Sequence, residues 1–125
     1  MKLLQTIQRA RAETKRSKVL VLTNADTSPW DKLGLDTNVV TIPSMSLPIL
    51  CKTIAESNER IAAIIIETIP MRDLLHKRFM KRARELASAE GSLLIWNEQH
   101  SKNYFSYTDL QSFYEIKPDL SCEGL

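Results

Sequence analysis

The 125-residue chain has little glycine, few cysteines and almost no excess of charge of either sign. Three glycines and five prolines are too few for a protein built mainly from loops. Two cysteines exclude a small fold held together by several disulfides. Seventeen basic and fifteen acidic residues give a formal net charge of +2, which requires no polyanionic partner. This length, with 43% hydrophobic residues, suits a single domain over residues 1–125 with its own core.

The cysteines and the apolar runs indicate the compartment. Cys51 and Cys122 lie far apart and form no CxxC pair, so neither a zinc site nor a thioredoxin motif is indicated. We interpret both as reduced structural thiols, with Cys51 in the core, and expect a cytoplasmic protein. The N-terminal segment lacks the apolar stretch of a secretory signal. The longest apolar run, residues 61–66, is far shorter than the roughly 20 residues that cross a bilayer, so no membrane association is expected.

Hydrophobic periodicity predicts helices and strands in alternation. Helical spacing covers residues 2–15, the segment after Ser46 and residues 72–90, which Gly91 ends. In the last of these helices the expected buried stripe consists of Leu75, Phe79, Ala83, Leu86 and Ala87. Apolar or β-branched runs predict strands at residues 18–22, 39–42, 61–66 and 93–96. An aromatic-rich tail over residues 104–116 is expected to hold a short helix around Leu110 and Phe113.

This order of elements predicts βαβ units. We therefore expect an α/β fold with a small, mostly parallel sheet and flanking helices, joined by right-handed crossovers. In such sheets, ligands bind at the carboxyl ends of the strands. Polar residues occupy those positions here, namely Asn24, Asp26, Glu67, Asn97, Glu98 and His100. An alternative of equal weight is that these residues are polar only because loops are solvated.

Four stretches, in order, resemble a known enzyme family. IAAIIIE at residues 61–67 resembles the family's AAVIVEP, and LLIWNE at residues 93–98 resembles its LLIFDE. Pro118-Asp119-Leu120 is similar to the PDL before the family's catalytic lysine, and residues 9–18 are similar to its RxARxxTGRxKI. The family is that of the class III aminotransferases, which depend on pyridoxal phosphate (PLP). The similarity is greatest to the middle of glutamate-1-semialdehyde aminomutases, within their PLP-binding large domain.

The resemblance implies positions near the cofactor for three residues. Glu67 and Glu98 match the family, whereas Asn97 replaces the Asp that pairs with the protonated pyridine nitrogen. A neutral amide cannot favour protonation of that nitrogen by charge. The Schiff-base lysine falls at about Leu125, which cannot form one, and the phosphate loop would lie before Met1. We therefore expect an incomplete or degenerate aminotransferase-like protein without independent catalysis and without an assignable catalytic residue. PLP is the one cofactor implied, although three of its anchors are lacking.

Two binding functions are alternatives. Apolar surface left exposed in part of a larger fold favours self-association or a protein partner, so a small interaction module is the first. Its contact surface is expected from the aromatic residues Trp30, Trp96, Tyr104, Phe105, Tyr107, Phe113 and Tyr114. Nucleic-acid binding is the weaker alternative, because basic runs such as residues 9–18 and 77–84 are usually solvated helix faces. His76 and His100 form no metal-ligand spacing with the cysteines, so no metal is expected.

Overall fold

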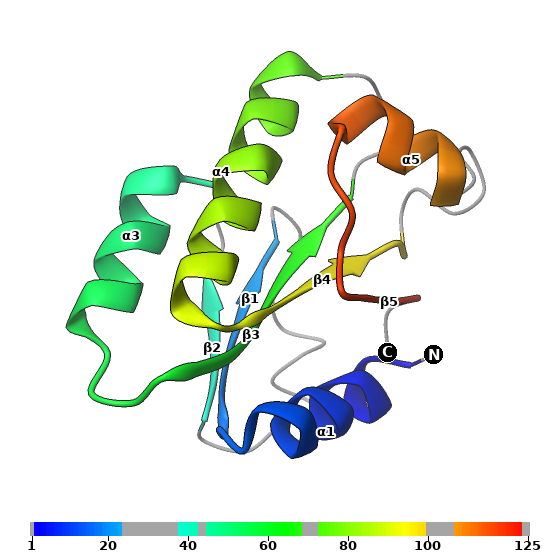
Figure 1. Ribbon diagram of the computed structural model, residues 1–125. Coiled ribbons are helices and arrows are strands. Elements are labelled where there is room, and N and C mark those ends of the chain that lie inside the picture. Colours follow the sequence, from blue (N-terminus) through cyan, green and yellow to red (C-terminus); the bar gives the residue numbers. More distant parts are fainter. Residues whose placement is uncertain (1, 24–37, 43–44, 69–72, 100–106, 124–125) are drawn as a thin grey trace.

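The computed structural model describes residues 2–23, 38–42, 45–68, 73–99 and 107–123 (Figure 1). Its helices are α1 (Leu3–Thr14), α3 (Leu47–Glu56), α4 (Leu74–Glu90) and α5 (Tyr107–Tyr114). Its strands are β1 (Lys18–Leu22), β2 (Val39–Ile42), β3 (Ile61–Glu67), β4 (Leu93–Asn97) and β5 (Leu120–Cys122). The predicted α/β fold is confirmed, and β5 is a strand that the sequence patterns did not predict.

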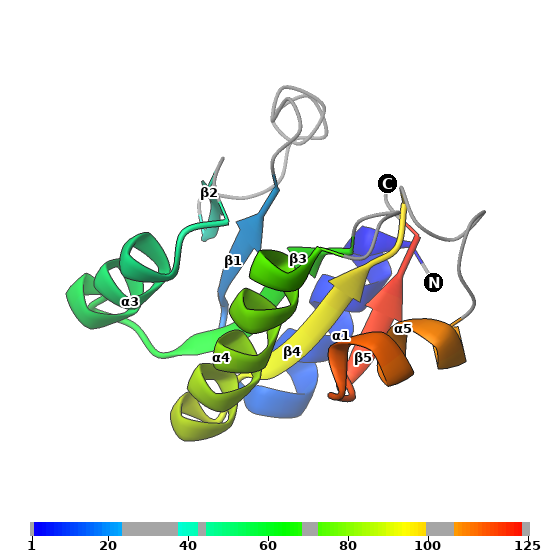
Figure 2. The same cartoon turned by 90° about the horizontal axis from the view of Figure 1, so that it is seen from above.

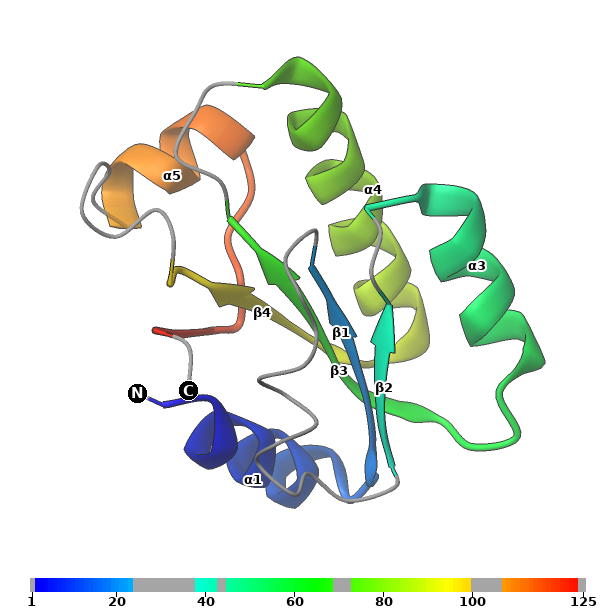
Figure 3. The ribbon, with the colours of Figure 1, turned by 180° about the vertical axis from the view of Figure 1, so that it is seen from behind.

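The five strands form one sheet in the order β2-β1-β3-β4-β5, and every neighbouring pair is parallel. Helix α1 covers one face of the sheet, and α3, α4 and α5 cover the other (Figure 2). Viewed from behind, α1 crosses below the sheet on its own (Figure 3). Parallel sheets are normally covered on both faces, and this arrangement explains why the central strands are apolar except at their end residues.

The core has two layers, one on each face of β3. All seven residues of β3 are buried. Ile64 and Ile66 pack toward α4, whereas Ala63 and Ile65 pack toward α1. Full burial of an isoleucine side chain contributes about 1.5–3 kcal/mol to stability, so β3 is the main apolar element of the fold.

The two ends of α4 are held by different groups. Asp73 is the N-cap, and its carboxylate accepts hydrogen bonds from the backbone N–H of Leu75 at 2.8 Å and of His76 at 3.3 Å. This cap explains why the helix begins at Leu74 rather than at residue 72. At the other end, the Arg16 guanidinium donates to the carbonyl oxygens of Glu90 at 2.8 Å and Ile61 at 3.0 Å. A cation there also complements the negative end of the helix dipole.

Two predictions of burial are wrong. Leu75 is 75% exposed, because the buried face of α4 consists of His76, Phe79, Met80, Ala83 and Ala87. A neighbouring residue is rotated by about 100° around a helix, which carries Leu75 away from that face. Cys51 is exposed for the same reason, since Leu50 is the residue of α3 that is fully buried. Cys122, in contrast, is buried in the layer beneath α1.

The described members of the expected aromatic contact surface pack inside the fold. Trp96 and Tyr114 are both fully buried, with ring centroids 5.5 Å apart, and Phe113 packs on Tyr114 at 5.1 Å. These rings fill the space between β4 and α5 and so cover the sheet instead of facing a partner. The remaining members of the set, Trp30, Tyr104, Phe105 and the side chain of Tyr107, lie outside the described residues.

Gly91 provides the left-handed C-cap of α4, with φ of +71°. A Cβ atom there would lie 3.1 Å from Arg16 Nη2, and a left-handed conformation costs about 1–2 kcal/mol for an L-residue with a side chain. We expect Gly91→Ala to lower the free energy of unfolding in urea by roughly 1–2 kcal/mol. Gly91→Asn is the matched control and should lose less, because Asn tolerates this conformation better. An unchanged urea midpoint for Gly91→Ala would contradict this account of the cap.

Candidate functional site at the carboxyl ends of the strands

Two polar side chains meet at the carboxyl ends of the central strands. Glu67 ends β3 and Asn97 ends β4, and the two are direct partners in the parallel ladder. Both are buried, with exposed fractions of 7% and 2%. They lie in phase with Ile65 and Ile95, so both side chains belong to the sheet face that α1 covers. The structure thus brings together two of the three residues that the resemblance implies.

Glu67 is held by the neighbouring strand. The hydroxyl of Thr23, directly after β1, donates a hydrogen bond of 2.5 Å to Glu67 Oε2. Thr23 is 1% exposed, and its backbone N–H donates to the Ile42 carbonyl at 3.1 Å. The sequence analysis did not identify Thr23 as a site residue. Its position in the sheet identifies it. Leu22 pairs with Ile66, so the next residues, Thr23 and Glu67, lie side by side.

Asn97 is engaged in the turn that follows β4. Its side-chain oxygen Oδ1 accepts the backbone N–H of Gln99 at 3.2 Å. Its backbone carbonyl accepts the N–H of Thr68 at 3.0 Å and the Thr68 hydroxyl at 3.3 Å. An Asn side chain that bonds to the backbone two residues later is a common way to end a strand in a turn. Asn97 therefore has a complete structural role at this position.

Glu98, the third residue of the resemblance, contacts the edge strand β5. Its backbone N–H donates to the Cys122 carbonyl at 2.8 Å. Burial raises the pKa of the Glu98 carboxyl above its ordinary value, a hydrogen bond with Ser121 opposes this rise, and the nearby charge of Glu123 adds to it. Glu98 is thus positioned by β5 and Asn97 by its own turn.

His76 approaches the same strand end from the other face of the sheet. Its exposed fraction is 6%, and its Nε2 atom lies 3.0 Å from the backbone carbonyl of Glu67. Because a carbonyl only accepts, Nε2 carries the proton and donates it. Burial lowers the pKa of His76, against the opposing effects of this hydrogen bond and of the charges of Asp73 and Glu67. The ring also packs edge-on to Tyr114, with centroids 5.6 Å apart.

Other predicted groups cannot be placed at this site. Asn24, Asp26 and His100 lie outside the described residues, as does Leu125. Within the described ranges, no group of three or more His, Cys, Asp or Glu side chains could hold a metal ion. None of the helices that the structure describes combines the length and apolar character needed to span a bilayer.

Comparisons with known proteins support the family resemblance and the fold. No family model matches the chain. The glutamate-1-semialdehyde 2,1-aminomutase of Desulforudis audaxviator is 28% identical over 145 residues, which cover 97% of this chain and 34% of that protein. The aminomutase of Heliobacterium modesticaldum is 32% identical over 101 residues, which cover 78% of this chain and 23% of that protein. The chain thus spans about a third or less of the length of these curated relatives.

The fold itself matches a solved structure. An omega-transaminase from Sphaerobacter thermophilus superposes with a TM-score of 0.73, over 95% of this chain and 34% of that chain. The sequences are 21% identical, so this match concerns the fold alone. The sheet and its helices therefore have the arrangement of part of an aminotransferase, as the motifs predicted.

The described residues do not fit the cofactor in the manner of that family. The pyridine nitrogen of PLP, when protonated, needs an acceptor, and the family's residue for this is a carboxylate. Asn97 is neutral, and its Oδ1 atom already accepts the Gln99 N–H. Glu67, its neighbour, accepts the Thr23 hydroxyl. Each of these acceptor groups thus already holds a hydrogen bond from the chain itself.

The burial of His76 predicts a pH dependence of stability. Since its pKa is lowered in the folded state, the unfolded chain binds more protons at acidic pH, and stability falls as the pH drops through about 6.5. Between pH 7.5 and 5.5 this residue accounts for a loss of up to about 1.4 kcal/mol. His76→Gln keeps a donor for the Glu67 carbonyl and removes the titration. Urea unfolding at both pH values should show a smaller loss for the variant than for the wild type; equal losses would argue against this origin.

Proposed function

We propose that this chain, which resembles the central part of the class III PLP-dependent aminotransferases, is an aminotransferase-like α/β domain that does not transaminate by itself. The observation that carries the proposal is Asn97 at the end of β4, in the position of the family's Asp. Its side-chain oxygen accepts the Gln99 N–H, and the residue is 2% exposed. The strand end that holds the cofactor ring in the family is here used to close a turn.

The consequence for chemistry follows from charge. In the family, the carboxylate keeps the pyridine nitrogen protonated, which makes the ring an electron sink. An Asn side chain provides N–H donors and one oxygen, and it cannot stabilise the extra proton by charge. The ring of a bound PLP would therefore lack the electronic state that transamination needs. This argument concerns only residue 97 and does not depend on which segments surround the chain.

The second support is the residue at the position of the Schiff-base lysine. The resemblance places that position at about Leu125, and a leucine has no amine to react with the aldehyde of PLP. Lys117 is the nearest described lysine in the sequence. It lies between α5 and β5, and its backbone carbonyl accepts a hydrogen bond of 3.1 Å from Arg84 Nη1. Its place before the edge strand differs from that of the family lysine, which follows the PDL motif.

The test is transamination by the purified chain. We expect amino-group transfer from an amino acid to a 2-oxo acid, with saturating PLP, to proceed no faster than with PLP alone, as followed by chromatography of both products. An intact class III aminotransferase assayed in parallel serves as the positive control. Asn97→Asp should remain equally inactive, because it restores the carboxylate without the lysine. A rate above that of free PLP, saturable in the amino acid, would overturn the proposal.

An interaction module is the second candidate, and one observation favours it. Leu74 and Leu75, at the start of α4, are 66% and 75% exposed. These are the highest exposed fractions of any large hydrophobic side chain in the part of the chain that the structure describes. Adjacent leucines exposed to this degree are unfavourable in water and are typical of contact surfaces. This pair of leucines is not part of the aromatic surface expected from the sequence. It lies in the first turn of α4, at the carboxyl end of the sheet.

A further inference from the structure

The outward face of α4 carries a stripe of one leucine and three cations. Leu74, Lys77, Arg78 and Lys81 are spaced at i, i+3, i+4 and i+7, so they lie on one side of the helix. Together they line a groove of about 230 Å³. We call this groove the α4 groove. A second hollow, of about 310 Å³, lies beside it and is lined by Lys77, Asp109, Ser112 and Phe113.

The charges of this face are unbalanced within the helix. Residues 74–84 contain five basic residues and no acidic one. Of these, Lys77 and Arg78 lie nearest the N-terminal end of α4, where the positive end of the helix dipole disfavours cations. Like charges at i and i+4, such as Lys77 and Lys81, add further repulsion. Glu115 already relieves the repulsion between these two lysines, and an anionic partner would do the same for Arg78.

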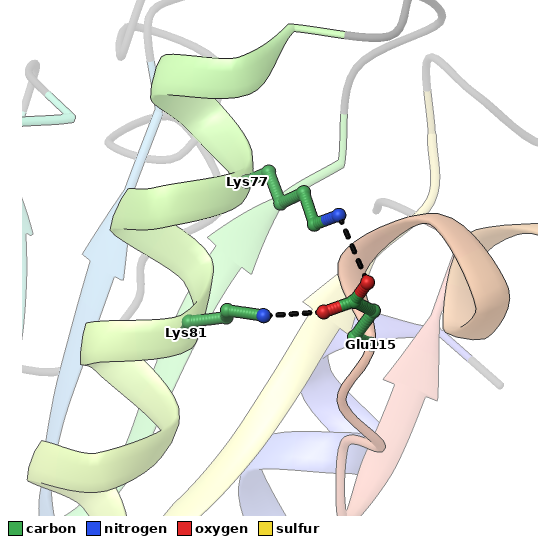
Figure 4. Close-up of polar contacts among 3 residues, drawn as sticks. All are labelled: Lys77, Lys81 and Glu115. Carbon is green, nitrogen blue, oxygen red and sulfur yellow. Dashed lines mark hydrogen bonds and ion pairs between the residues drawn. The ribbon is translucent and has the colours of Figure 1, made fainter.

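Four of these five cations already form ion pairs within the chain. Lys77 and Lys81 each contact one oxygen of Glu115, which follows α5 (Figure 4). These two lysines hold the pKa of Glu115 below its usual range. Arg82 pairs with Glu85 and Arg84 with Asp119. Arg78 is exposed and has no acidic partner among the described residues. Arg78 is therefore the cation most available to a partner.

We propose that the α4 groove is a docking surface for an acidic protein segment that carries leucine-like side chains. The segment's carboxylates would pair with Arg78, and its apolar side chains would cover Leu74, which lines the groove, and its exposed neighbour Leu75. The stripe from Leu74 to Lys81 covers seven helical steps, or roughly 10 Å, which is about two turns of an opposing helix. This inference is independent of whether the chain transaminates.

Two other occupants are less suited to the groove. A second copy docking through the same face would place its own cations opposite those of the first, which is repulsive. A nucleic acid would pair with the cations but would leave the two exposed leucines uncovered. An acidic and apolar peptide matches both properties of the surface.

The experiment measures fluorescence anisotropy with a short fluorescein-labelled peptide of alternating glutamate and leucine pairs. We expect saturable binding to the full chain that weakens as salt is raised. Arg78→Glu should weaken binding roughly tenfold, because it places a like charge against the peptide. Leu74→Ser should weaken it by a similar factor through lost apolar contact. The matched control is Arg9→Glu, which makes the same charge change on α1 at the opposite face of the sheet and should bind as the wild type does.

Circular dichroism and urea unfolding establish that each variant is folded, which Arg78→Glu should be, since its side chain is exposed. Absence of saturable peptide binding overturns the proposal. Equal losses in Arg78→Glu and Arg9→Glu also overturn it, because they indicate only a general charge effect. A labelled DNA duplex that binds more tightly than the peptide and is released by Arg78→Glu would assign the groove to nucleic acid instead. Dimers disrupted by Arg78→Glu would assign it to a second copy.

Discussion

Parallel pairing of all five strands is the constraint on which the remaining features depend. It places every carboxyl end at one edge of the sheet, so the last residues of β3 and β4 and the residue after β1 must lie side by side. Polar groups that meet there are buried and need hydrogen-bond partners. The hydrogen bond from Thr23 to Glu67 joins the ends of β1 and β3, and the Asn97 side chain closes the turn after β4. Parallel pairing also requires cover on both faces, which α1 and α3–α5 provide.

The same edge underlies our proposal that a chain with a fold like that of part of an aminotransferase does not transaminate by itself. In this chain, the Glu67 carboxylate accepts the Thr23 hydroxyl and the Asn97 side-chain oxygen accepts a backbone N–H. His76 adds a further contact from α4, at the Glu67 carbonyl. Helix α4 thus has two distinct faces: an inner one that supports the strand end and an outer one that is basic and carries exposed leucines. The inner face supports the core, and the outer face carries the docking surface that we propose.

The sequence allowed the fold to be predicted where burial leaves a clear pattern. β3 and β4 are apolar up to their last residues because helices cover both faces of the sheet. Gly91 marks the end of α4 because the backbone there is left-handed, which favours glycine. β5 was missed because three residues at a sheet edge are too short for any periodicity. His76 was missed as a core residue because a polar side chain interrupts the apolar stripe. Glu67 and Asn97 could be placed at one edge, but the Thr23 contact depends on register, which a single sequence does not specify.

We propose that the strand ends are closed by their own hydrogen bonds and do not hold PLP. The most direct measurement is a titration of the purified chain with PLP, followed by absorbance, borohydride reduction and intact mass. We expect no saturable spectral shift. Borohydride should trap PLP on several lysines, with the same distribution as in a control sample of the chain unfolded in urea. A saturable shift with a single covalent adduct on one lysine, lost on unfolding, would contradict this proposal.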